Sequence, residues 1–168
     1  MGVYNIRQVE EGLLHCSKCG IDKTEDQFHK SSSQKNTSGR VYHCKSCVAK
    51  TQTKRNMTEV GFKSNLWQNL LGNAKRRNIP VYIDKSDIQK LYDEQGGLCA
   101  VTGLPMQFSA LESGKNSYAV SVDRIDSSKG YYKDNIRLVC SRVNLIKMEL
   151  SDDQMRFWCN LILKGSNK

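Results

Sequence analysis

Two cysteine pairs place the strongest constraint on the fold of this chain. Two residues lie between Cys16 and Cys19, two lie between Cys44 and Cys47, and 24 residues separate the pairs. This spacing lets both sulfurs of a pair reach one ion at about 2.3 Å, and four thiolates suit a closed tetrahedral zinc site. A redox Cys-x-x-Cys motif would need only one pair, and two disulfides would need an oxidising compartment. We therefore predict one structural zinc ion per chain, in a zinc ribbon or a treble-clef-like loop.

The charge of the chain narrows its possible partners. Its 168 residues contain 26 Lys and Arg against 17 Asp and Glu, which gives a formal charge of +9. Such an excess attracts phosphate polymers or an anionic membrane surface. The apolar runs are too short to span a bilayer, and the first twelve residues lack the apolar segment of a secretion signal. We therefore expect a cytoplasmic protein with no membrane partner and no small-molecule substrate.

A first helix is predicted after a polar linker. The tract 50–58 is polar, has no apolar period, and is predicted to be a linker. From residue 62, apolar residues recur at helical spacing. The last turn of this helix is a basic cluster of Lys75, Arg76 and Arg77. The helix is therefore expected to pack by one face and to end in positive charge.

A second helix is predicted after Pro80. The pattern Ser86-x-x-Gln89 is a capping box, and two glycines at 96 and 97 end the helix. Tyr92 lies on its apolar face, so this pattern alone is compatible with a core role for the tyrosine.

Residues 118–150 are predicted to form a strand, a loop, a second strand and a helix. The strands are expected at 118–123 and 136–139, on either side of a long turn around Gly130, and the helix over 140–149. Asp123 and Asn144 can face each other across this unit and offer a carboxylate and a carbonyl oxygen to one hard cation. Mg²⁺ tolerates so few protein ligands, because it keeps several waters and takes its remaining positions from phosphate oxygens.

The pattern D-R-I-D-S-S-K-G-Y-x-x-x-N-I-R-L-V-C-x-x-x-N-x-I-K, at residues 123–147, resembles the ββα-metal motif of HNH endonucleases. With the cysteine pairs in front of it, the likeness covers roughly residues 14–150 and extends to rare-cutting restriction enzymes and to phage and mobile-element nucleases of this family. It implies that Asp123 and Asn144 hold a catalytic Mg²⁺ or another divalent cation, and that Asn135 braces the loop through backbone hydrogen bonds. It also implies a sequence-specific endonuclease that hydrolyses double-stranded DNA, of the restriction or the phage homing type.

The chain departs from the family pattern at two places. Members with a second zinc site have more paired cysteines, whereas residues 98–150 contain only Cys99 and Cys140, so we expect packed thiols and no second zinc there. Arg124 stands where the family has its histidine base. Arginine keeps its proton at any working pH and cannot be that base. We expect its guanidinium to clamp the scissile phosphate.

The general base must then be another group, and three candidates remain. In relatives with an arginine at this position, a tyrosine from a preceding helix joins the active site, and Tyr92 occupies the corresponding place. A metal-bound hydroxide could also act without a protein base. Tyr131 and Tyr132 in the turn are the third possibility.

DNA binding is expected to involve the basic residues around the motif. Singly, each is better explained as a solvated surface charge, but as a set beside a metal site they indicate phosphate contacts. The set consists of Lys129, Lys133, Arg137, Arg142 and Lys147. Base recognition is expected in loop 30–43 and at Lys75, Arg76 and Arg77.

A last helix is predicted after the motif. Ser151 and Gln154 form a capping box, and Met155, Trp158, Cys159 and Ile162 follow along one side. The helix could close the small core or form the seam of a homodimer, because cleavage of both DNA strands by a symmetric enzyme requires two active sites.

These patterns together predict an α+β protein with three parts. They are a four-cysteine zinc-binding module over 1–57, a two-helix bridge over 58–97 and the nuclease core with its C-terminal helix over 98–168. The predicted function is a metal-dependent DNA endonuclease. The alternative is a zinc-dependent DNA-binding protein whose nuclease core has decayed. The absence of the family histidine at Arg124 suggests this alternative.

Overall fold

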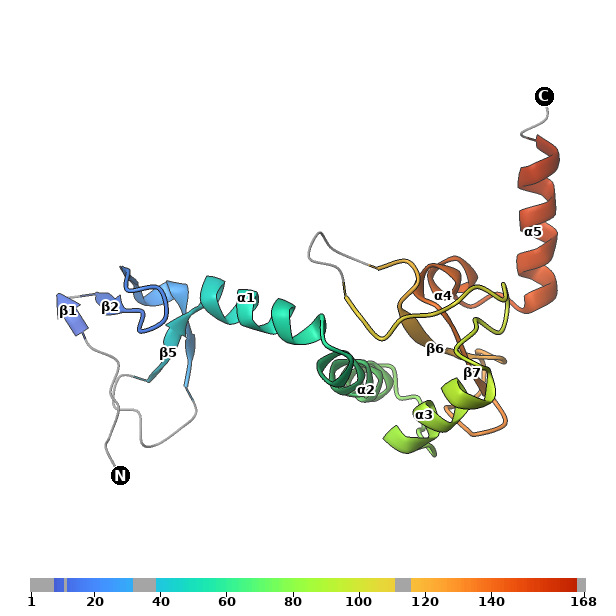
Figure 1. Ribbon diagram of the computed structural model, residues 1–168, viewed down its shortest axis with the longest axis horizontal. Helices are drawn as coiled ribbons and strands as arrows, with labels where there is room; N and C mark the ends of the chain where they lie inside the picture. Colours follow the sequence, from blue (N-terminus) through green and yellow to red (C-terminus); the bar gives the residue numbers. More distant parts are fainter. Residues whose placement is uncertain (1–7, 11, 32–38, 111–115, 166–168) are drawn as a thin grey trace. The chain divides into compact units, whose positions relative to one another are not determined.

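The computed structural model describes residues 8–10, 12–31, 39–110 and 116–165 (Figure 1). The chain forms two compact units, Met1–Arg55 and Asn56–Lys168. Short antiparallel strands and helices make up both units, so the predicted α+β class is confirmed. The three-part division at residues 57 and 97 stays a prediction.

The first unit consists of short strands followed by one helix. Its strands form a three-stranded antiparallel sheet in the order β1-β2-β3 and a separate pair, β4-β5. The elements are β1 (Gln8–Glu10), β2 (Leu13–His15), β3 (Asp22–Thr24), the 3₁₀ helix η1 (Glu25–Gln27), β4 (Phe28–Lys30), β5 (Arg40–Cys44) and α1 (Lys45–Asn56). Residues 32–38 of the predicted base-reading loop lie outside the described residues.

Among the residues that the structure describes, the core of the first unit is very small. Its buried cluster consists of Leu14, Phe28 and three cysteines, Cys16, Cys44 and Cys47. Because only two of these five residues are large apolar side chains, the described core buries little apolar surface to offset the entropy of folding. A metal ion bound by the cysteines would add to the stability of this unit.

The predicted linker over 50–58 contains the boundary between the two units, after Arg55, but most of it is helical. Helix α1 continues to Asn56 before α2 begins at Glu59. The lack of an apolar period excludes an amphipathic helix, but it does not exclude a helix exposed on all sides.

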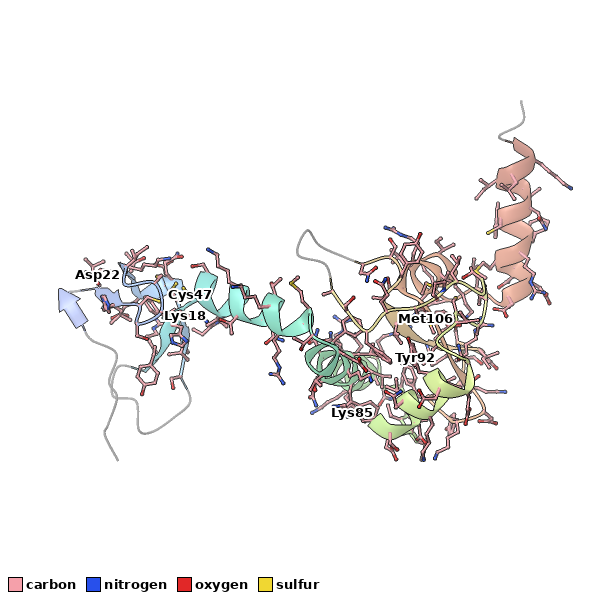
Figure 2. The ribbon with its side chains drawn as sticks, in the orientation of Figure 1. Lys18, Asp22, Cys47, Lys85, Tyr92 and Met106 are labelled. Carbon is pink, nitrogen blue, oxygen red and sulfur yellow. The ribbon has the colours of Figure 1, made fainter. Side chains whose placement is uncertain are left out.

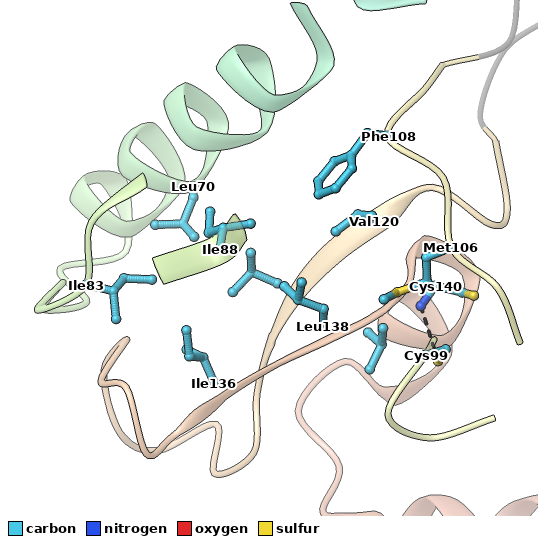
Figure 3. Packing of buried hydrophobic residues seen from close by; sticks show 12 residues of the cluster. Leu70, Ile83, Ile88, Cys99, Met106, Phe108, Val120, Ile136, Leu138 and Cys140 are labelled. Carbon is cyan, nitrogen blue, oxygen red and sulfur yellow. Dashed lines mark hydrogen bonds between the residues drawn. The ribbon is translucent and has the colours of Figure 1, made fainter. Parts of the chain in front are cut away.

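Within residues 56–110 and 116–165, the second unit has four helices and one strand pair. Its elements are α2 (Glu59–Arg76), α3 (Lys85–Glu94), β6 (Val120–Arg124), β7 (Ile136–Cys140), α4 (Ser141–Lys147) and α5 (Asp152–Gly165). The core cluster contains residues of both strands and of α2 and α3. Figure 3 shows four of its members, Leu70, Ile88, Val120 and Leu138. Within the described residues, no helix has the length and apolar content needed to cross a membrane.

Side-chain caps begin three of these helices. Thr58 accepts a hydrogen bond from the Gly61 backbone N–H at the start of α2. The capping box of α3 is Asp84 with Asp87, two residues earlier than the predicted Ser86 and Gln89, because Asp84 takes the N-cap position. The predicted box at α5 is confirmed by hydrogen bonds in both directions between Ser151 and Gln154.

Strands β6 and β7 form an antiparallel hairpin with a long loop. Its register pairs Asp123 with Arg137, which lie seven residues on either side of Gly130. Gly130 packs tightly on the chain before α3, since a Cβ atom there would lie 2.5 Å from the Pro80 carbonyl oxygen. Helix α4 follows β7 directly, which completes the ββα unit.

Candidate functional site

A polar cavity of about 400 Å³ lies between the ββα unit and α2. It brings together five residues that were predicted from the sequence to act in catalysis or DNA binding. They are Arg76, Arg77, Asp123, Arg124 and Asn144. Three arginines around one carboxylate make the cavity suited to an anionic ligand.

Asp123 is held by two cations. Its side chain is 3% exposed, Oδ2 accepts a hydrogen bond from Arg137 Nε at 2.9 Å, and Oδ1 accepts one from Lys147 Nζ at 3.1 Å. Lys147 is fully buried and also donates to the Arg124 carbonyl oxygen at 2.9 Å. The carboxylate is therefore fixed in position by β7 on one side and by α4 on the other.

Arg137 connects Asp123 to the beginning of α5. Its terminal nitrogens donate to both carboxylate oxygens of Asp152, at 2.5 and 2.6 Å. This ion pair lowers the pKa of the Asp152 carboxyl and raises the pKa of Arg137. The predicted DNA contacts by Arg137 and Lys147 are corrected here, because both side chains are enclosed and paired with carboxylates. Asp152 is a residue of the site that no sequence pattern indicated.

Asn144 presents one amide group to the cavity. Its Nδ2 donates to Ser121 Oγ at 2.7 Å and to the Val122 carbonyl oxygen at 3.2 Å. Its carbonyl oxygen is the atom that could hold a cation. A carboxylate offers about four acceptor positions, and two donors contact Asp123. These two side chains therefore still fit a hard divalent cation that prefers oxygen ligands.

Arg124 follows Asp123 and lines the same cavity. Its side chain donates from Nη1 to the Lys129 carbonyl oxygen at 2.5 Å, and its guanidinium carbon lies 5.5 Å from the centre of the Tyr131 ring. Guanidinium carries five N–H donors, so an arginine anchored by one of them can still bind a second anion or acceptor.

Asn135 braces the loop as expected from the sequence. Its Oδ1 accepts a hydrogen bond from the Asp126 backbone N–H at 2.9 Å, and its Nδ2 donates to the carbonyl oxygens of Asp126 and Gly130. These bonds hold the segment that carries Arg124 and Tyr131, but Asn135 does not line the cavity.

Tyr92 is not brought into the cavity. Its hydroxyl donates to the Met106 carbonyl oxygen at 3.1 Å, and its ring lies 4.5 Å from the ring of Phe108 (Figure 2 labels Tyr92 and Met106). Tyr131 instead lines the cavity, whereas Tyr132 stacks on the exposed Tyr82. The expectation that Tyr92 joins the active site is therefore corrected, because its hydroxyl bonds to the core backbone.

The other predicted DNA contacts lie at the surface. Lys75 and Arg142 are exposed, and Arg142 lines a second cavity, whose described lining contains no carboxylate. Lys129 pairs with Asp126 at 3.4 Å and Lys133 with Asp87 at 2.9 Å, with both lysine side chains about two-thirds exposed. These four residues remain accessible to a phosphate backbone.

The four N-terminal cysteines form one cluster. The sulfur atoms of Cys16, Cys19, Cys44 and Cys47 all lie within 4.8 Å of one another, so they can hold a metal ion such as zinc. A hydrogen bond from the Ser46 hydroxyl is the main cause that lowers the pKa of Cys44 to about 5, and burial raises the pKa of Cys47 to about 12. A bound cation would remove this difference, because it favours the thiolate of every ligand.

Cys99 and Cys140 lie apart from this cluster, in the core of the second unit. Each is 2% exposed, and the Cys140 backbone N–H donates to Cys99 Sγ at 3.3 Å (Figure 3). Val143 packs against the same core. The prediction that these two thiols are packed side chains is confirmed.

Comparison with known proteins identifies a similar solved structure and a family. The chain is similar to the solved structure of the rare-cutting HNH restriction endonuclease PacI, with 24% sequence identity over 90% of this chain and 94% of that one and a TM-score of 0.45. This enzyme is of the rare-cutting HNH type that the pattern at residues 123–147 resembles. No curated protein matches the sequence. The model of the YonG N-terminal domain matches residues 8–94, which are 87 of the 168 residues. Because this match spans more than half of the chain, the protein belongs to the YonG N-terminal domain family.

Proposed function

We propose that the protein is a metal-dependent endonuclease that cleaves double-stranded DNA at specific sequences. The observation that carries this proposal is the cavity on the ββα unit, where Asp123, Asn144 and Arg124 lie together beside two arginines at the end of α2. Oxygen ligands for a hard cation next to several phosphate-binding groups suit hydrolysis of a phosphodiester. The HNH-like pattern at residues 123–147 supports the same reaction.

Each side chain has a separate role in this proposal. Asp123 and Asn144 would hold Mg²⁺, which supplies charge neutralisation at the scissile phosphate when it is bound. Arg124 would clamp a phosphate oxygen and stabilise the charge that develops on it. Arg76 and Arg77 would position the neighbouring phosphates without reading the bases.

The base that activates the water is proposed to be Tyr131. The alternative is activation without a protein base, which a Mg²⁺ ion held by Asp123 and Asn144 would supply when bound. Tyr131 lines the cavity, and the centre of its ring lies 5.5 Å from the guanidinium carbon of Arg124. Tyr92 does not line the cavity, and its hydroxyl donates to the Met106 carbonyl oxygen.

Two matched substitutions separate these candidates. We expect Tyr131→Phe to lower the cleavage rate by roughly 10²-fold, because the ring remains but the proton acceptor is lost. Tyr92→Phe is expected to keep the rate and to lose about 1 kcal/mol of stability with its hydrogen bond. Single-turnover cleavage rates and urea unfolding of both variants make the comparison. Full activity of Tyr131→Phe from about pH 6 to 9 would overturn Tyr131 as the base and favour activation without a protein base. A large loss in Tyr92→Phe alone would also overturn the assignment.

A homodimer is proposed from the surface of α5. Met155 is buried, but the apolar stripe continues beyond it with Trp158 54% exposed, Leu161 43% and Ile162 66%. A helix of 14 residues is marginal without packing, so an uncovered stripe favours association.

The helix offers a matched pair of residues that tests this dimer. Ile162 and Leu163 are 66% and 65% exposed, but Ile162 continues the stripe that begins at Met155, and Leu163 lies about 100° further around the helix. We expect Ile162→Glu to convert a dimer to a monomer and Leu163→Glu to leave the dimer intact, as measured by sedimentation velocity. A monomeric parent protein, or equal effects of the two variants, would contradict the α5 seam.

The proposed function is tested by incubating the protein with DNA of mixed sequence, with Mg²⁺ and with a chelator. We expect breaks that require the metal, and sequencing of the new ends gives the recognition site. Binding without cleavage under all conditions would instead support a DNA-binding protein with an inactive core.

A further inference from the structure

Helix α1 lies in the most one-sided stretch of charge in the chain. Residues 27–58 contain seven Lys and Arg and no Asp or Glu. Four of the seven lie on α1, namely Lys45, Lys50, Lys54 and Arg55. No acidic residue of this stretch can neutralise them, so the helix carries a concentrated positive potential.

The surface of α1 is almost entirely exposed. Of its twelve residues, ten are exposed and only Cys47 is buried. Its first turn is fixed by the cysteine cluster, because Cys44 ends β5 and Cys47 lies on the helix (Figure 1). Thr51, one turn later, bonds to Lys18 in the loop between Cys16 and Cys19. The side with Cys47 and Thr51 therefore faces the cluster, and the other sides point away from it.

The chemistry of α1 selects its partner. A helix that binds a membrane surface needs an apolar face, and the exposed side chains of α1 are polar or basic apart from Val48 and Ala49. A positive helix with polar side chains suits a nucleic acid. The major groove of B-form DNA is about 12 Å wide and admits a helix, whereas that of A-form RNA is too narrow.

We infer that α1 is a DNA-recognition helix that enters the major groove, positioned there by the cysteine cluster. Lys50 and Lys54 bind phosphates of the groove walls. Gln52 and Ala49 lie about 100° and 160° around the helix from Thr51. Glutamine is a residue type that contacts adenine edges, and alanine is one that contacts thymine methyl groups. The inference rests on the proposed function for its choice of duplex DNA, and it assigns sequence reading to a segment separate from the cleavage site.

Duplex binding at several salt concentrations tests this role. We expect Lys50→Gln/Lys54→Gln in the full chain to bind duplex DNA about tenfold more weakly near 0.15 M salt. The slope of log K against log salt concentration should become smaller in magnitude by about 2, because each lost phosphate contact reduces this slope by about 0.9. The control is Lys85→Gln/Lys90→Gln on α3, which removes the same charge from two exposed lysines. It is expected to bind like the parent protein. Gln52→Ala is expected to change the sequences that a random duplex pool yields.

The outcomes separate this inference from the proposed nuclease. If the parent cleaves DNA but the α1 variant binds with unchanged affinity and slope, the recognition helix is wrong and the nuclease stands. If the parent binds DNA without cleaving it and the α1 variant loses binding, the nuclease is wrong and the recognition helix stands. Equal losses in the α3 control, or equally tight binding to duplex RNA through the same lysines, would overturn the inference.

Discussion

Replacing Asp123 with alanine is expected to abolish DNA cleavage and to lower the free energy of unfolding by about 3–5 kcal/mol. The loss of stability follows from Lys147, which is fully buried and would keep only the Arg124 carbonyl oxygen as its partner. The loss of activity follows from the removal of the proposed Mg²⁺ ligand. Urea unfolding and single-turnover cleavage measure the two effects on the same protein.

A second substitution separates these two effects. Asp123→Ala/Lys147→Met removes both members of the buried pair, and the methionine fills a similar volume, so most of the lost stability should return. Cleavage should stay absent, because the ligand is still missing. A stable Asp123→Ala protein would contradict the buried ion pair, and a double variant that cleaves DNA would contradict the role of Asp123 at the metal.

Removal of zinc is expected to unfold the first unit and leave the second unit folded. The buried cluster of the first unit contains only Leu14 and Phe28 besides its cysteines, so the metal must supply much of its folding free energy. Purified protein should contain about one zinc per chain, and a chelator should abolish the dispersed NMR signals of the first unit alone. Small zinc-dependent modules gain about 10–16 kcal/mol from the ion, so this effect is large.

The chain carries a control for the zinc prediction. Cys44→Ser should lose the metal, whereas Cys159→Ser, which changes an exposed cysteine of α5, should retain it. Two zinc ions per chain would contradict the packed roles of Cys99 and Cys140. Zinc retained by Cys44→Ser with full affinity would contradict the four-cysteine site.

The parts of the fold with a short sequence pattern were predictable from the sequence. Each cysteine pair has a fixed two-residue spacing, and the ββα order follows from the residues of one short segment. The bracing role of Asn135 was implied by the resemblance to HNH endonucleases. Helix α1 was missed because hydrophobic periodicity identifies only helices with an apolar face.

The surroundings of Asp123 were not predicted, although part of the signal was present. A hairpin centred on Gly130 pairs Asp123 with Arg137, and Lys147 lies one turn after Asn144 on the same side of α4. Both cations could therefore have been assigned to the carboxylate instead of to DNA. The contact between Arg137 and Asp152 joins β7 to α5, and the position of Tyr92 depends on Met106 and Phe108. Such contacts depend on tertiary packing, which spacing alone does not give.

The most direct test of the nuclease proposal compares cleavage by the parent protein and by Asn144→Ala. This substitution removes a proposed metal ligand but leaves the contacts of Asp123 with Arg137 and Lys147 in place. Both proteins are incubated with plasmid and mixed-sequence linear DNA in Mg²⁺, and the fraction of cut DNA is followed over time. We predict Mg²⁺-dependent cutting by the parent and at least roughly 10²-fold slower cutting by folded Asn144→Ala. Equal rates for the two proteins, or cutting that persists in a chelator, would contradict the proposed site.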